Sequence, residues 1–234
     1  MPTTDVDGFV RRAQGYALGA LPVLFVMVFA LHFRHWRDFF TFRLSYVARP
    51  ARDTVTALIA LGGRRPVLHD PHMLGYLGLP LFLLTAFGLY RLGRTVRPRL
   101  ALLGVALSAT GAIYLGGLFG SWTAFFGIGM VDPAYTDGAI ASFAVLTAPH
   151  GALLVSMVLS KMAIIGLVVQ ALALFGTGVV PRWSSAVAAI GCVLIVLFWD
   201  LDNWMLIGSV LMLAGFVPMS RRLVASRPAI ESRG

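Results

Sequence analysis

Charged residues are scarce in this sequence. Aspartate, glutamate, lysine and arginine make up 12% of its 234 residues, whereas 58% of the residues are hydrophobic. A soluble domain usually carries about 25% charged residues. Lysine, glutamate and cysteine each occur once, at Lys161, Glu231 and Cys192. The single cysteine excludes an intrachain disulfide, and the lone glutamate argues against paired-glutamate chemistry within the apolar segments.

Familiar catalytic motifs are also absent. The sequence contains no H-E-x-x-H pair for zinc, no glycine-rich nucleotide pattern and no G-x-S-x-G around a nucleophilic serine. The formal net charge is +9, yet the arginines flank apolar runs and do not form a soluble basic domain. We therefore exclude nucleic acid as a partner and expect anionic membrane lipids to balance this charge.

Six apolar runs dominate the chain. A bilayer-spanning helix needs about 20 residues, and most of the runs approach or exceed this length. The second run begins at Pro71, directly after Asp70, which is a common N-cap residue type, and proline suits the first turn of a helix. The sequence thus predicts a single all-α, polytopic membrane domain. The predicted spans are 16–33, 71–92, 99–120, 149–175, 183–199 and 204–219.

The distribution of arginine predicts the orientation. Six spans place both termini on one side of the membrane, together with the arginine-rich loop 91–99, Arg182 and the basic tail 220–234. The positive-inside rule makes this side cytoplasmic in a bacterial inner membrane and places the acidic loop 121–148 outside. Residues 34–70 conflict with this rule because they carry seven arginines. Arginines mixed with aromatic residues favour an interfacial segment there, and a re-entrant piece is the alternative.

Lys161 lies near the middle of the run 149–175, where a charged side chain costs about 2.5–3.5 kcal/mol on the insertion scale. Three placements are open. The ammonium group faces the bundle interior and donates to the third span, at Ser108, Thr110 or Tyr114; it lines a wet cavity; or the span is shifted and the lysine lies less deep. Either of the first two makes Lys161 an intramembrane site for an acidic ligand group or for proton transfer.

A small residue recurs at every fourth position of the third span. Such a ridge lets a neighbouring helix backbone approach closely, so we interpret it as a helix-packing seam and infer no ligand from it. The ordinary abundance of glycine and alanine in apolar helices is the alternative explanation. The members of this ridge are Gly104, Ser108, Ala112, Gly116 and Gly120.

The five histidines gather near the predicted outer face. With the nearby aspartates they offer ligands for zinc, copper or iron. His72 and His150 each follow a proline at a helix start, so we expect them to share a metal or a haem if the chain binds one. The simpler interpretation is interfacial histidines hydrogen-bonded to water, headgroups or loop carbonyls. The candidate ligands are His69, His72, His150 and Asp200.

Two segments carry a resemblance to a known family. They are GTGVVPRWSSAVAAIGCVL at 176–194 and Gly-Leu-Tyr-Arg at 88–91. Both are similar to stretches of an uncharacterised bacterial family of six-span integral membrane proteins, a domain of unknown function. The resemblance covers residues 71–219. It implies a fold of six helices and no particular activity.

Two functions therefore stay open. We expect a non-enzymatic membrane protein, which is either an accessory subunit of a larger membrane complex or a bundle that binds a lipid or another small lipophile between its helices. The alternative is a metal- or haem-dependent redox enzyme that uses the histidines and aspartates of the outer face. Whether the chain is an enzyme is thus left undecided at this stage.

Overall fold

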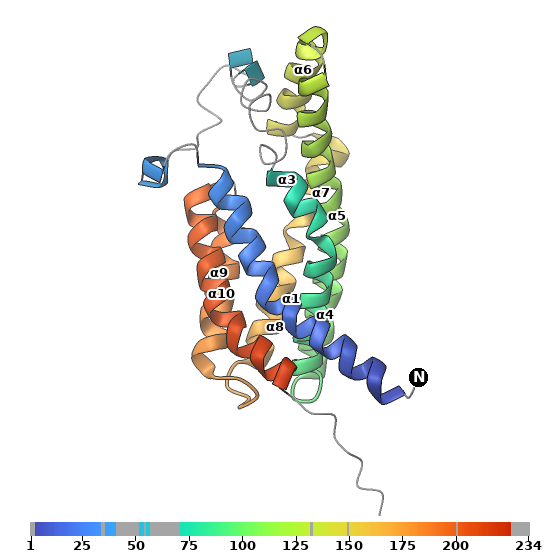
Figure 1. The fold of residues 1–234 in the computed structure, drawn as a ribbon, viewed down its shortest axis with the longest axis vertical. Coiled ribbons are helices and arrows are strands. Elements are labelled where there is room, and N and C mark those ends of the chain that lie inside the picture. The colour runs from blue at the N-terminus through green and yellow to red at the C-terminus, as the bar shows by residue number, and fades with distance from the viewer. Residues whose placement is uncertain are drawn as a thin grey trace, which may run out of the picture.

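Every regular element in the described part of the chain is a helix (Figure 1). The computed structural model describes residues 3–33, 36–40, 52–53, 55–56, 71–131, 133–148, 150–199 and 201–225. In chain order the elements are α1 (Thr3–Leu31), η1 (Trp36–Phe40), α3 (Pro71–Leu77), α4 (Leu79–Gly93), α5 (Pro98–Val131), η2 (Pro133–Tyr135), α6 (Thr136–Thr147), α7 (Gly151–Ser160), α8 (Met162–Leu174), α9 (Arg182–Leu197) and α10 (Asp202–Ala225).

Among the described residues, four helical stretches are long and apolar enough to cross a membrane. They are Val6–Leu31, Pro98–Phe125, Gly151–Leu174 and Asp202–Ala225. The shorter apolar helices α4 and α9 coincide with the predicted spans 71–92 and 183–199. The all-helical class is confirmed for the described residues. It suits a membrane, because a helix satisfies its own backbone hydrogen bonds where no water is present.

Six helices pack side by side as a closed ring. α1 packs on α10, α10 on α9, α9 on α8, α8 on α5 and α5 on α4, and α4 returns to α1. α4 also contacts α8 across the ring. The centre is filled by buried side chains that come from all six helices. Examples are Leu18, Phe82, Leu167, Ile195 and Phe216.

The first and last helices are tied together at one end of the bundle. The Ser220 hydroxyl donates to the Gly15 carbonyl at 2.6 Å, and the buried Arg11 guanidinium donates to the Leu223 carbonyl at 2.7 Å. The start of α1 and the end of α10 therefore lie at the same end of the molecule (Figure 1). The turn that follows α4 lies at this end too, since Arg97 donates to the carbonyl of Leu172, near the end of α8.

At the opposite end, α5 continues beyond the ring and carries α6 beside it (Figure 1). α5 has 34 residues, which corresponds to about 50 Å at 1.5 Å per residue. Val55, Phe125 and Phe143 belong to a small second core there. Asn203, at the start of α10, donates to the Phe39 carbonyl at 3.0 Å. The described parts of the predicted interfacial segment thus lie at the end of the bundle that carries α6.

α5 and α8 meet backbone to backbone. A Cβ built on Gly111 would come within 2.6 Å of the Ala163 Cα, and a Cβ built on Gly166 would collide with the Gly104 carbonyl and with Ser108. α9 and α10 approach each other through glycines in the same way. Without a strong hydrophobic drive between helices in lipid, such close approach supplies the van der Waals contact that holds them together.

Gly111→Ala is expected to lower the free energy of unfolding by about 1–3 kcal/mol, the usual cost of forcing extra atoms into a packed site. Gly117→Ala is the matched control on the same helix, because nothing lies within 4 Å of its added Cβ. Thermal unfolding of the detergent-purified protein should give a lower midpoint for Gly111→Ala, with an unchanged or higher one for Gly117→Ala. Equal midpoints would contradict the backbone contact.

Candidate functional site

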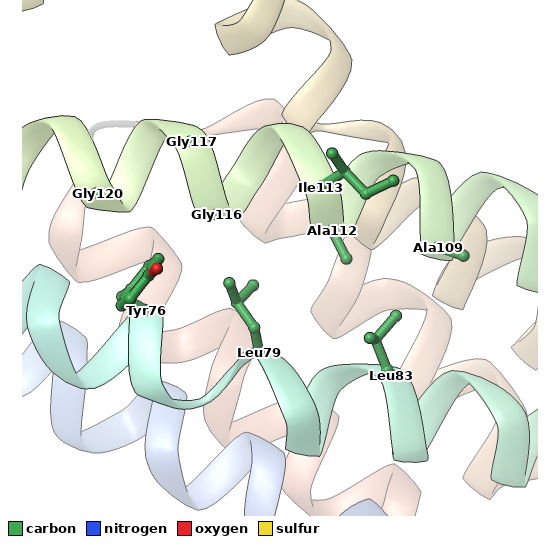
Figure 2. A pocket seen from close by; sticks show the side chains of 9 residues that line it. All are labelled: Tyr76, Leu79, Leu83, Ala109, Ala112, Ile113, Gly116, Gly117 and Gly120. Atoms are coloured by element: carbon green, nitrogen blue, oxygen red, sulfur yellow. The ribbon is translucent and has the colours of Figure 1, made fainter.

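An apolar groove lies between the α3–α4 pair and α5 (Figure 2). Its volume is about 530 Å³. Leu79 and Leu83 point from α4 towards α5, and Ala112 points back from α5 (Figure 2). Ile113 is 75% exposed at the rim, so the groove opens on the outside of the bundle. The lining residues are Tyr76, Leu79, Leu83, Ala109, Ala112, Ile113, Gly116, Gly117 and Gly120.

Glycines make the groove on both of its walls. Gly116, Gly117 and Gly120 leave one side of α5 without side chains (Figure 2). The opposite wall changes direction at Gly78, which separates α3 from α4. A Cβ at Gly78 would meet the end of the Leu24 side chain of α1, so the glycine lets this turn lie close against α1. The groove therefore follows from where the chain omits side chains on two neighbouring elements.

The predicted packing seam is divided between two neighbours. Gly104 and Ser108 face α8, whereas Ala112, Gly116 and Gly120 face the α3–α4 pair and line the groove. Helix geometry explains the division. Four residues turn by about 400°, so a row at this spacing rotates by about 40° at each step and by about 160° over its length. The two ends of the row thus point to nearly opposite sides of α5.

The groove has one polar end. Tyr76, which is 47% exposed, lies beside Gly120, with a ring carbon 3.9 Å from where a Cβ of that glycine would stand. His72 lies one turn earlier on α3, and its ring is 6.1 Å from that of Phe119. The Tyr76 phenol brings a hydrogen-bonding group to a groove whose other lining residues carry no polar side-chain atoms.

His72 pairs with His32, a residue that the sequence did not single out as a ligand. Their ring centroids are 5.4 Å apart in an edge-to-face arrangement, and His72 stacks on Trp122 at 5.1 Å. His32 Nδ1 lies 2.8 Å from the Val28 carbonyl. Because a carbonyl only accepts, Nδ1 carries the hydrogen, and in the neutral form of the ring Nε2 is the acceptor. Two imidazoles, one from α3 and one from the turn after α1, therefore meet at the end of the bundle that carries α6.

In the described part of the chain, the other predicted metal ligands do not come together in one site. His150 is exposed and forms the extended N-cap of α7. His69 and Asp200 lie outside the described residues, so their part in a metal site stays a prediction, as does a metal shared by His72 and His150. Within the described ranges, no group of three or more histidine, cysteine or acidic side chains is placed to hold a metal ion.

Lys161 lies at the junction between α7 and α8. Its amide donates to the Val158 carbonyl at 3.3 Å, a bond to the third preceding residue that tightens the helix locally. The ammonium Nζ lies 5.8 Å from the centroid of the Trp199 ring. Trp199 stands two residues past the end of α9. Lys161 therefore lies level with the end of α9 and not with its middle. This position favours the third predicted placement, in which the span is shifted and the lysine lies less deep.

Ser108 has a partner other than the lysine. Its hydroxyl donates to the Ala163 carbonyl at 3.1 Å and so joins α5 to α8. Tyr114, the other polar candidate of the third span, is partly exposed. A further buried polar contact was not foreseen: Gln170 donates from Nε2 to the Ala86 carbonyl at 2.8 Å. Its amide ties α8 to α4 in the centre of the ring, and only the rarity of glutamine in apolar runs hinted at this role.

Comparisons with protein families, with curated proteins and with solved structures find no match for this chain.

Lys161→Met is expected to cost about 0.5–1 kcal/mol of stability, the usual worth of an accessible cation–π contact. A double-mutant cycle with Trp199→Leu should recover this value as the coupling energy, measured by unfolding in detergent. Lys161→Arg serves as the control because a guanidinium retains the contact. A loss above about 3 kcal/mol would instead indicate a buried, hydrogen-bonded ammonium group and would contradict this placement.

Proposed function

We propose that this chain is a membrane protein that binds a single-chain lipophile in the groove between the α3–α4 pair and α5. The groove is the observation that carries the proposal. Its volume of about 530 Å³ falls within the usual range for small-ligand sites, about 300–1,000 Å³. Nine residues line it, and only Tyr76 has a polar side-chain atom.

The shape of the groove selects the class of ligand. It runs along α5 from Ala109 to Gly120, which is about 16 Å at 1.5 Å per residue. An apolar trough of this length, open along its side, fits one acyl or isoprenoid chain. Tyr76 at one end supplies a hydrogen-bonding phenol for a polar head. A partner helix is the competing occupant and would make the chain an accessory subunit.

Gly117→Leu should block the groove without disturbing the fold. Nothing lies within 4 Å of a Cβ added at Gly117, so the new side chain enters open space within the groove. We expect photo-crosslinking by a diazirine fatty acid to fall at least several-fold on peptides of α3 to α5. The measurement uses purified protein in phosphatidylcholine nanodiscs.

Gly138→Leu is the control, because its added Cβ also meets nothing within 4 Å and Gly138 lies on α6, away from the groove. Equal labelling of wild type and Gly117→Leu would overturn the proposal. Loss of a co-purifying protein, with labelling unchanged, would favour the accessory-subunit role.

We propose a topology of six membrane spans with both termini in the cytoplasm, because six helices pack into the ring. α4 and α9 lie between helices of spanning length, and α3 with α4 runs from 71 to 93 with a break only at Gly78. Arginines gather at the end where α1 begins and α10 ends, and the positive-inside rule makes this end cytoplasmic. The exposed arginines there are Arg12, Arg94, Arg97, Arg99, Arg182, Arg221 and Arg222.

This topology predicts opposite labelling at two positions. Arg94 is exposed in the turn after α4, and Tyr135 is 55% exposed before α6. In intact bacteria expressing the Cys192→Ser protein, a membrane-impermeant maleimide should label Tyr135→Cys and not Arg94→Cys. Both should react once the membrane is permeabilised, which controls for accessibility. Labelling at 94 but not at 135 in intact cells would invert the model.

A metal- or haem-dependent redox activity is the second candidate. The pairing of His32 with His72 supports it, because His32 keeps an Nε2 lone pair for a metal. Metal analysis and an absorption spectrum of the purified protein separate the two candidates. Stoichiometric metal or a Soret band, lost in His72→Ala with the fold retained, would favour this activity over simple lipophile binding.

A further inference from the structure

A second hollow lies at the arginine-rich end of the bundle, away from the groove. Its volume is about 350 Å³. The loop between α8 and α9 forms one wall, and the last turns of α10 form the other. The lining residues are Val179, Val180, Pro181, Pro218, Arg221 and Arg222. Two arginines and four apolar residues thus line one concave surface.

The loop wall is built firmly. Gly176 and Gly178 both adopt positive φ, at 75° and 78°, which fold the loop tightly after α8. The Thr177 hydroxyl donates to the Leu174 carbonyl at 2.8 Å, and the Val179 amide lies 3.4 Å from the same hydroxyl. Val180 is only 5% exposed. The hollow therefore does not have to be ordered by its ligand, which lowers the cost of binding.

The charge of the hollow is positive from two sources. Arg221 and Arg222 are both exposed on the last turns of α10, and a guanidinium fork matches the oxygens of a phosphate. Pro181 is the N-cap of the 16-residue α9 and has no side-chain oxygen for the first amides of that helix. The positive end of the α9 dipole adds to the field of the two arginines.

The position of the hollow indicates a lipid as the source of the phosphate. Trp183, two residues after Pro181, is 55% exposed, and exposed tryptophans mark the headgroup level of a bilayer. Basic pockets between helices on the cytoplasmic side of membrane proteins recognise anionic headgroups. The apolar walls suit the glycerol backbone and the first methylenes that adjoin such a headgroup. A free phosphate ion has no apolar part that could contact these walls.

We infer that the hollow formed by the α8–α9 loop and the end of α10 binds the phosphate of an anionic glycerophospholipid. Arg221 and Arg222 hold the phosphate oxygens, and Val179, Val180 and Pro218 contact the apolar part of the headgroup region. This site is separate from the groove of α5 and does not depend on it. It gives the chain a fixed lipid neighbour at its cytoplasmic end.

The test uses full-length protein in a zwitterionic detergent and follows its thermal midpoint during titration with dioctanoyl-phosphatidylglycerol. The wild type should be stabilised in a saturable way. The double variant Arg221→Gln/Arg222→Gln should need about tenfold more lipid, or more, for half of the effect, since each arginine near a lipid surface contributes about one factor of five in affinity. Dioctanoyl-phosphatidylcholine and inorganic phosphate should give little stabilisation.

The matched control is Arg94→Gln/Arg99→Gln, which removes the same charge from exposed positions at the same end, outside the hollow. It should respond like the wild type, and the midpoints without lipid confirm that both variants are folded. If the lipid stabilised both double variants equally weakly, the effect would come from general surface charge, and the proposed site would be wrong. Stabilisation by inorganic phosphate equal to that by the lipid would overturn the lipid assignment.

Discussion

The contact between the backbones of α5 and α8 is the constraint on which the rest of the bundle depends. Gly111 lies directly on the backbone at Ala163, and Gly166 lies on the backbone at Gly104. The same stretch of α8 holds Gln170, whose amide reaches the Ala86 carbonyl of α4. α8 is thereby fixed against two neighbours at once, and α9 packs on its remaining side. Any side chain at these glycines would push α5 outward and would open the centre of the ring.

Helix existence was predictable from the sequence because it depends on local hydrophobicity and length. The all-helical class and most of the helix positions follow from the apolar runs alone. The end of α5 was not predictable in this way: it continues from 120 to Val131 through an aromatic-rich stretch that packs on α6. That extension is stabilised by contacts with residues distant in sequence, and no local pattern encodes them.

The candidate site was accessible to sequence reasoning only in part. The residues Ala112, Gly116 and Gly120 were recognised as a row of small side chains, but a row alone does not say which of its members face a helix and which face open space. The partner of His72 also depends on how the turn after α1 meets α3. For Lys161, the decisive quantity is the level at which the neighbouring helix α9 ends, because that level places Trp199 within reach.

Small residues have two opposite effects along α5, depending on the neighbour that they face. Where a neighbour approaches to backbone contact, as at Gly111, the missing side chain increases attraction. Where the α3–α4 pair stays further away, as at Gly117, the missing side chain leaves a hollow. α3 and α4, which form the opposing wall, pack in turn on α1. The groove is thus a product of packing elsewhere in the bundle.

The bonds between the first and last helices have a consequence for the order of assembly. The two hydrogen bonds that join α1 to α10 connect residues 205 and 212 positions apart. Synthesis proceeds from the N-terminus, so α1 enters the membrane long before its partner exists. Until α10 emerges, one flank of α1 and the polar groups at Gly15 and Arg11 face lipid or transient partners. The ring therefore closes only when the last helix is made, and a chain that ends before α10 leaves α1 with α3 and α4 as its neighbours and one flank uncovered.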